Sequence, residues 1–375
     1  MKRVLYKCIG AVLCLSLLAG CSSGSIYSNY RETEQLMVVQ TMGFDESPKG
    51  FSVSVSTGGE EKITRMAAEA ESITLAEQKM QDYSAAEEIF YAHTSYIAIG
   101  ESAARSGLSH YMDFIGRSTQ MRMDTPLFVV TGGNASELVL GSGNEEYDAT
   151  DVLKSLERNI SRRGDLQIFT AGEVAAQLDR NGSALICAVR CVQAKDSLYG
   201  SQEELTAVPD GYAVIKDRKM IGRISYHDAL AVGIIQNKAG PCRLTVSSDE
   251  GNAALQLDDC ICRLEPVYEN GELRGLSVDV KLRTALLERG DAVNLDAVAA
   301  TLKKDIGLRL ENVLKLSKLT GCDFLQLCSR LQVKQPFSSG EIQGEFQELL
   351  PHIYYIINVS AEIDRSFDAD REENA

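Results

Sequence analysis

The residues best spaced for chemistry are Leu18-Ala19-Gly20-Cys21. Small residues before a cysteine leave the backbone open to a signal peptidase, and the Cys21 sulfur can accept a diacylglycerol group. This is the bacterial lipoprotein pattern. The alternative is an ordinary signal peptide with a cysteine at this position by chance. We therefore expect Cys21 to be a lipidation site and the first residue of the mature chain.

The segment before Cys21 has the organisation of a signal peptide. Lys2, Arg3 and Lys7 form a basic start, and an apolar run from Cys8 to Leu18 follows. That run is shorter than the about 20 residues that a membrane-spanning helix needs. We expect residues 1–20 to be the signal peptide and residues 21–30 a lipidated tether. Two or more acyl chains give stable anchoring, since each buried CH₂ contributes roughly 0.8 kcal/mol.

Other residue types that support catalysis or metal binding lack the necessary spacing. No histidine lies in a His-Glu-x-x-His pattern; the histidines are His93, His110, His227 and His352. Cys260-Ile261-Cys262 has no second pair that would complete a zinc site. The sequence has no phosphate-binding loop, and its Gly-x-Ser-x-Gly spacing at residues 20–24 belongs to the lipoprotein pattern around Cys21, so we expect no nucleophile elbow. We expect no catalytic residue, no metal, no cofactor and no enzymatic activity.

The cysteines of the mature chain beyond Cys21 favour a structural role. Their number is odd, and a chain of this length does not need a disulfide framework. We expect most of them to be small buried apolar side chains, and one disulfide is left open. They are Cys187, Cys191, Cys242, Cys260, Cys262, Cys322 and Cys328.

Two polar features stand out against their surroundings. His93 lies in an apolar stretch from Ile89 to Ile99 that we predict to be one strand. This position favours a histidine in the core or at the sheet edge whose ring nitrogens have hydrogen-bond partners. Asp113, Arg117 and Arg122 lie close together in the sequence. Their simplest role is ion pairing within the fold, and the alternative is contact with a partner.

The charge balance excludes some classes of partner. The whole chain carries a net charge of −15, and loss of Lys2, Arg3 and Lys7 with the signal peptide takes it to −18. Nucleic acid and anionic lipid would both repel such a chain. Membrane contact is therefore expected to come from the lipid or from embedded proteins.

Hydrophobic periodicity predicts an α+β fold with several domains, in which helices pack on antiparallel or mixed sheets. Leu276 to Leu286 alternates apolar and polar residues as a half-buried strand does, and Leu295 to Leu319 carries an apolar stripe typical of a helix. A polar stretch before Pro209-Asp210-Gly211 suggests a boundary. We predict an N-terminal α+β region at residues 31–205, with two subdomains as an option, a C-terminal domain at 206–367 and a charged tail at 368–375.

Taken in order, the segments resemble the Ger(x)C family of spore germination lipoproteins, the C subunits of nutrient germinant receptors. The resemblance begins at Cys21 and continues through segments that match the family's short motifs. The first, Met42-Gly43-Phe44-Asp45, resembles an early strand of the family that ends in a turn. The others are Glu88 to His93 with Ile97 to Glu101, Tyr111 to Arg117, Gly211 to Lys216 with Met220 to Gly222, and Gly321-Cys322-Asp323-Phe324.

The resemblance implies a non-catalytic receptor subunit in spore germination. Its partners would be the membrane-embedded A and B subunits, and its place the extracytoplasmic face of the cell or spore inner membrane. We expect the segment from Asp113 to Arg122 and the hairpin around Lys216 to Lys219 to be docking elements. One alternative is an extracytoplasmic solute-binding lipoprotein of a transport system, which would show two lobes with a deep cleft. A lipid-anchored hydrolase is the other, and it would need a clustered acid, base or nucleophile.

Overall fold

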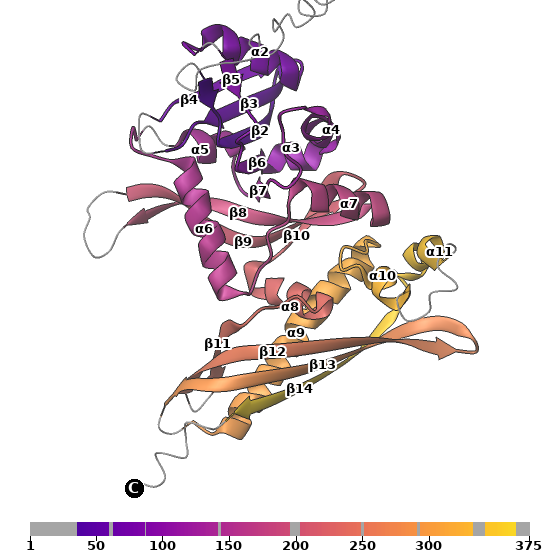
Figure 1. Cartoon of the computed structure of the whole chain (residues 1–375). Helices are drawn as coiled ribbons and strands as arrows, with labels where there is room; N and C mark the ends of the chain where they lie inside the picture. Colours follow the sequence, from indigo (N-terminus) through magenta and orange to yellow (C-terminus); the bar gives the residue numbers. More distant parts are fainter. Residues whose placement is uncertain are drawn as a thin grey trace, which may run out of the picture.

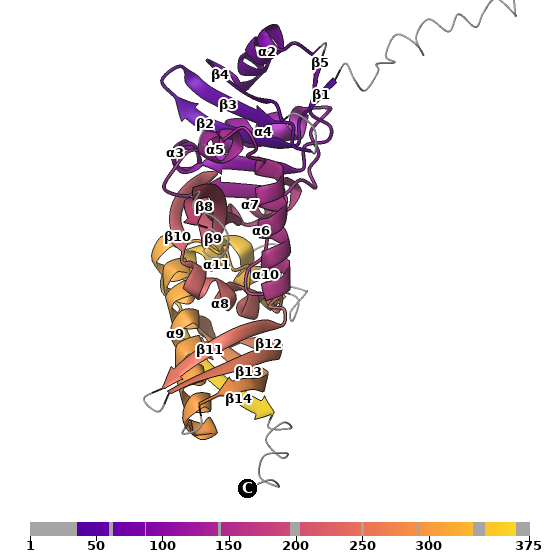
Figure 2. The same ribbon diagram turned by 90° about the vertical axis from the view of Figure 1, so that its left-hand side faces the viewer.

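The structure is a computed structural model that describes residues 36–59, 63–86, 88–141, 144–195, 203–248, 251–290, 293–332 and 342–364. Cys21, the predicted signal peptide, the tether and the predicted tail lie outside these residues. The described chain forms an elongated body, with the amino-terminal elements at one end and the carboxy-terminal sheet at the other (Figures 1 and 2). The predicted α+β class with mixed sheets is confirmed.

An eight-stranded mixed sheet forms the larger half. Its order is β10 (Lys219–Ile224), β9 (Glu203–Lys216), β8 (Ser183–Lys195), β7 (Leu127–Val130), β6 (Tyr96–Gly100), β2 (Thr41–Ser47), β3 (Gly50–Ser56) and β4 (Arg65–Ala70). The middle strands β8, β7, β6 and β2 are mutually parallel, and antiparallel strands extend the sheet on both sides. Consequently β2, β6, β7 and β8 all end at the same edge of the sheet.

Helices connect and cover these strands. They are α2 (Ile73–Tyr83), α3 (Glu101–Ser106), α4 (Ser109–Arg117), α5 (Ala135–Leu140), α6 (Ala149–Arg163) and α7 (Ala171–Asn181). Several begin at the side-chain caps that their sequences favour. Asp148 accepts N–H bonds at the start of α6, and Thr170 with Glu173 forms a capping box at the start of α7.

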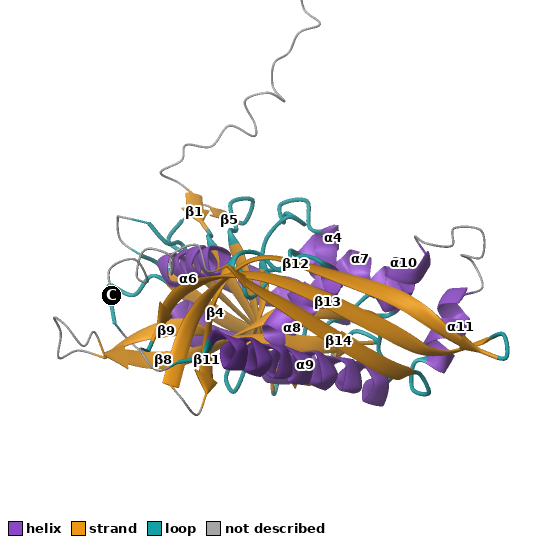
Figure 3. Cartoon of the chain, turned by 90° about the horizontal axis from the view of Figure 1, so that it is seen from below, coloured by secondary structure: helices purple, strands orange, loops and turns teal. Residues whose placement is uncertain are grey.

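The carboxy-terminal half is a four-stranded sheet on a long helix. The sheet has the order β11 (Cys242–Ser248), β12 (Gly251–Glu269), β13 (Glu272–Arg289) and β14 (Tyr354–Asp364). Helix α9 (Leu295–Thr320) packs along it, as Figure 3 shows from below. Both patterns predicted from the sequence are confirmed, because the apolar residues of β13 between Leu276 and Leu282 and the α9 stripe from Leu302 to Leu314 are buried.

Helix α8 (Tyr226–Gln236) connects the two sheets. It is buried nearly all round, from Ala229 to Ile235, which suits a helix packed between layers. Asn237 ends it in the left-handed conformation and pairs its side-chain amide with the backbone of Cys262 in β12, at 2.7 and 3.0 Å. The short helices α10 (Leu327–Gln332) and α11 (Ile342–Leu349) complete this half.

The predicted domain boundary between residues 205 and 206 falls inside β9, and the chain leaves the eight-stranded sheet only after Ile224.

The stretch from Ile89 to Ile99 corrects one prediction. It is not a single strand: β5 (Glu88–Phe90) pairs in parallel with β1 (Leu36–Val38), and β6 begins only at Tyr96. Between β5 and β6 the chain turns, and the Thr94 hydroxyl donates to the Tyr91 carbonyl at 2.7 Å. His93 lies in this turn and is exposed, so the prediction of a core or edge histidine is wrong.

Two further sequence interpretations change in detail. Asp45 does not end β2 in a turn but lies within the strand, opposite Ser52, and the β2–β3 hairpin turns at Pro48-Lys49. No disulfide joins the seven described cysteines to one another; five are buried, and Cys191 and Cys260 are half-buried. The prediction that most of them serve as buried apolar side chains is confirmed.

Candidate functional site

The segment predicted as a partner contact forms an exposed, charged surface. Asp113 and Arg117 lie one turn apart on α4, and the Arg117 Nε atom is 2.6 Å from the Asp113 carboxylate. Arg122 pairs not with Asp113 but with Asp124, at 2.5 Å. The side chains of Arg117 and Arg122 are 80% and 61% exposed. The predicted ion pairing is present, and every one of these charges remains accessible to a partner.

A cavity of about 600 Å³ lies beside this surface. Its walls come from α2, from Tyr91 directly after β5, and from α4 with the turn that follows it. Asp113 and Arg117 line it together with the aromatic rings of Phe51 and Phe114. The fold thus brings a predicted contact segment to the mouth of a cavity, which the sequence pattern did not reveal.

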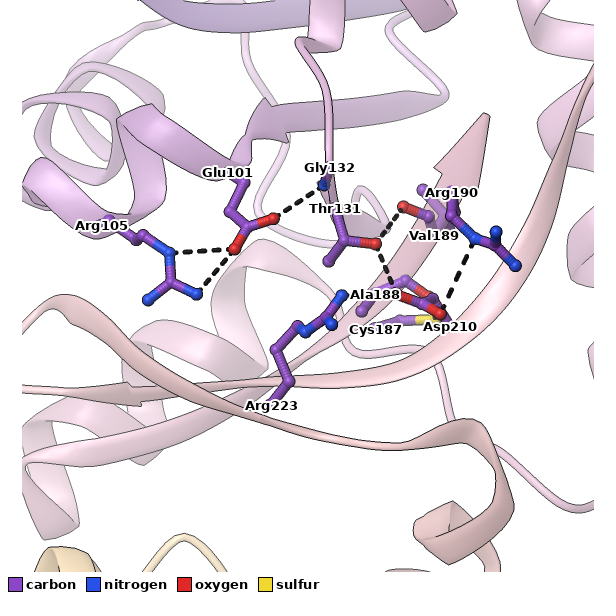
Figure 4. Close-up of polar contacts among 10 residues, drawn as sticks. All are labelled: Glu101, Arg105, Thr131, Gly132, Cys187, Ala188, Val189, Arg190, Asp210 and Arg223. Atoms are coloured by element: carbon purple, nitrogen blue, oxygen red, sulfur yellow. Dashed lines mark hydrogen bonds and ion pairs between the residues drawn. The ribbon is translucent and has the colours of Figure 1, made fainter. Parts of the chain in front are cut away.

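A second group of polar side chains gathers where the parallel strands end (Figure 4). Glu101, directly after β6, accepts the backbone N–H of Gly132 after β7 at 2.7 Å and pairs with Arg105 at 2.7 Å. Burial alone would raise the pKa of Glu101, but the Gly132 N–H and the Arg105 guanidinium together hold this pKa below its usual range. The carboxyl edge of parallel strands is where open α/β sheets bind ligands, so this network lies at a position where a ligand site is expected.

Asp210 is the centre of the remaining contacts in Figure 4. It is the extra residue of a bulge in β9, since Ala188 pairs with Gly211 and Val189 with Pro209. A bulge re-aims a side chain, and here the Asp210 carboxylate accepts the Thr131 hydroxyl at 2.7 Å and Arg223 at 2.9 Å. Gly211 beside it has φ +94°, and a Cβ there would lie 2.1 Å from the Ile224 carbonyl oxygen.

The strand-end network serves structure rather than ligand binding. Its carboxylates already have partners: Glu101 holds Gly132 and Arg105, and Asp210 holds Thr131 and Arg223. These contacts connect the end of β6 to the end of β7, the end of β7 to β9 across the intervening β8, and β9 to β10, so they fix this part of the sheet. The sequence signals for it were the residues after each apolar strand and the Pro209-Asp210-Gly211 run, but their pairing depends on tertiary structure.

Within the described ranges, no group of three or more His, Cys, Asp or Glu side chains is arranged to hold a metal ion. Among the helices that the structure describes, none is both long and apolar enough to cross a membrane.

Comparison with known proteins decides the family. The model of the spore germination protein N-terminal domain matches residues 29–190, and the model of the spore germination B3/GerAC-like C-terminal domain matches residues 210–367. The chain belongs to the GerAC family of spore germination proteins. It is thus a germinant receptor subunit that acts in spore germination, as the resemblance implied, and the solute-binding alternative is not favoured.

Two relatives support this family assignment. The chain is 22% identical over 346 residues to YfkR, a candidate spore germination protein of Bacillus subtilis (strain 168), covering 85% of this chain and 86% of that protein. The crystal structure of the GerBC protein has the same fold, with a TM-score of 0.57 and 16% identity over 86% of this chain and 96% of that one.

The strand-end network lies at the boundary between the two family domains. Thr131 and Arg190 belong to the N-terminal family domain, whereas Asp210 and Arg223 belong to the C-terminal one. The Thr131–Asp210 hydrogen bond and the β8–β9 pairing therefore join the two family domains into one sheet.

Proposed function

We propose that this germinant receptor subunit is held at the extracytoplasmic face of the cell or spore inner membrane by a lipid on Cys21, and that it acts without catalysis by contacting the membrane-embedded A and B subunits. The observation that carries the proposal is the order of features along the chain. Leu18-Ala19-Gly20-Cys21 directly precedes the two spore germination domains. The net charge of −15 disfavours adsorption to anionic lipid, so attachment falls to the lipid and to protein contacts.

The contact surface that we propose comprises Asp113, Arg117 and Arg122. Helix α4 lies in the same half of the molecule as β1, the first described strand, and the β11–β14 sheet lies at the opposite end (Figure 2). A chain anchored at its amino terminus therefore presents α4 on the side nearer its attachment. Exposed charges at the rim of an interface set orientation and association rate, and this surface offers such charges.

Metabolic labelling with a palmitate analogue tests the anchor. Wild-type protein is expected to take up label and to sediment with membranes. Cys21→Ala is expected to lose the label and to be either released or retained only through an uncleaved signal peptide. An unlabelled wild-type protein would refute the anchor.

Co-purification with the A and B subunits tests the surface. Arg117→Glu and Arg122→Glu are expected to reduce recovery of both partners. Arg274→Glu is the matched control, because Arg274 is also exposed and pairs with a carboxylate, that of Glu272, but lies in the far sheet. Equal recovery from Arg117→Glu and Arg274→Glu would contradict this surface. Normal germination of deletion spores with every nutrient would contradict the receptor role.

A further inference from the structure

The cavity beside α4 contains acceptor groups that the fold does not use. It has a volume of about 600 Å³, which is within the range of small-molecule sites. Phe51 of β3 and Phe114 of α4 give it aromatic walls, and Glu77 of α2 supplies a carboxylate. Ligand sites usually combine apolar walls with a few convergent polar groups; here Phe51, Ile73 and Phe114 form the apolar part of a lining that is otherwise mainly polar.

Glu77 is the first of these groups. It is half-buried, and it makes no hydrogen bond and no ion pair with any residue that the structure describes. Burial raises its pKa to about 7, and no neighbouring cation opposes this shift. A carboxylate in such surroundings gains from any donor or positive charge that enters the cavity.

Tyr91 is the second. Its side chain is 9% exposed, and its hydroxyl oxygen is buried without a hydrogen-bond partner. The charge of Glu77 further raises the pKa of this phenol, which places the two groups within electrostatic reach. Buried polar groups in native proteins are nearly always paired, so an unpaired hydroxyl and an unpaired carboxylate in the lining of one cavity indicate an absent partner.

The charges around the cavity select the class of ligand. Asp113 and Arg117 neutralise one another at the mouth, which leaves the charge of Glu77 uncompensated. His110 packs edge-on against Phe51 and also lines the cavity. An anion would meet repulsion from Glu77, whereas a cation gains both from its carboxylate and from the faces of the aromatic rings.

We propose that this cavity binds a small organic cation whose ammonium group donates to the Glu77 carboxylate and lies close to the Tyr91 hydroxyl. The aromatic rings of Phe51 and Phe114 enclose the apolar part of the same molecule. This binding is a property of the chain alone, so it neither requires nor tests the proposed docking to membrane subunits.

Three probes of one size separate charge from shape. Binding of butylammonium, butanol and butyrate to the full chain in detergent is measured by calorimetry at pH 8. Butylammonium is expected to bind at least tenfold more tightly than butyrate, with butanol between them. Glu77→Gln is expected to weaken butylammonium binding at least tenfold, and Tyr91→Phe to weaken it about threefold. Asp82→Asn is the matched control, since Asp82 is exposed on the same helix and does not line the cavity.

The pH dependence of butylammonium binding distinguishes a direct contact with Glu77 from a purely structural role of this residue, which would not change binding with pH. Protonation of Glu77 removes the attraction, so butylammonium binding is expected to weaken about tenfold between pH 8 and pH 6. His110, Asp113, Arg117 and Tyr91 face the same cavity, and the profile of Glu77→Gln reports their share, which is expected to be small. Because Glu77→Gln removes an uncompensated charge from a half-buried position, the variant should fold at least as well as wild type, and its melting temperature checks this. Butyrate binding as tightly as butylammonium, or full binding by Glu77→Gln, would overturn the proposal.

Discussion

The carboxylate of Asp45 lies against the backbone of Gly100 so closely that a Cβ at residue 100 would be 2.1 Å from its Oδ1 atom. Asp45 is buried within β2, and its two oxygens accept the N–H groups of Ala135 and Ser136 at 2.7 and 2.8 Å. Burial raises the pKa of Asp45, and these two hydrogen bonds oppose the rise. One carboxylate therefore fixes the ends of β2 and β6 to the start of α5, and a residue without a side chain at position 100 makes this possible.

Replacing Gly100 with alanine is expected to destabilise the protein by about 1–3 kcal/mol, the usual cost of overpacking a buried site. The Cβ must displace either the Asp45 carboxylate or the strand. Gly116→Ala is the control, because Gly116 is in α4 and a Cβ there meets nothing within 4 Å. A helical glycine replaced by alanine is expected to stabilise by up to about 1 kcal/mol. Denaturant unfolding measures both changes. Similar unfolding midpoints for the two variants would show that the Asp45 carboxylate can move away from a Cβ at residue 100 without loss of stability.

The Thr131–Asp210 hydrogen bond is expected to couple the two family domains energetically. Thr131→Val and Asp210→Ala should each destabilise the protein by about 1–2 kcal/mol, because each removes this partly buried hydrogen bond. The double variant should cost clearly less than the sum of the two, since contacting residues are not additive. Arg190→Gln is the control: its Nε atom is 4.0 Å from the Asp210 carboxylate, and its side chain is 57% exposed. Strictly additive costs for Thr131→Val and Asp210→Ala would show that the bond contributes little.

Helices and strands with a strong hydrophobic periodicity were predictable from the sequence. Strands whose ends are not marked by glycine or proline were not. The stripe of α9 and the alternation of β13 gave their positions to within a few residues. In contrast, the polar residues Asp258 and Asp259 divide the apolar pattern of β12 into two segments, at a shift in its register with β13, so the sequence does not mark β12 as one continuous strand. The turn between β5 and β6 contains neither glycine nor proline, so nothing in the sequence marked it.

The candidate sites were predictable only in part for a related reason. Asp113, Arg117 and Arg122 could be selected as a charged cluster because they are close in sequence. The hydrogen-bond partners of Asp45 are 90 and 91 residues away in the sequence. Glu77 lacks a hydrogen-bond or ion-pair partner among the described residues, and this depends on the position of every side chain around it. A missing partner has no signature in a sequence, whereas in a structure it is visible directly.

Asp323 provides a prediction of pH-dependent stability. It is 3% exposed, and its carboxylate accepts the N–H groups of Leu327 and Cys328 at 2.7 and 3.0 Å, at the start of α10. Burial raises its pKa from 3.8 to about 7, and these backbone hydrogen bonds only partly oppose the rise. Between pH 4 and pH 7 the folded state therefore holds a proton that the unfolded state has released.

This difference in bound protons sets the sign of the pH dependence. The contribution of Asp323 to stability is fully present below pH 4 and is lost as the pH rises to 7, with a slope of up to about 1.4 kcal/mol per pH unit. Other groups titrate in the same range, so the quantity to measure is the difference from Asp323→Asn, whose amide oxygen still accepts one N–H and carries no charge. The free energy of unfolding of this variant minus that of wild type is expected to increase from pH 4.5 to pH 7. A difference that stays constant with pH, or falls, would show that Asp323 is ionised in the folded protein throughout and that its backbone hydrogen bonds outweigh its burial.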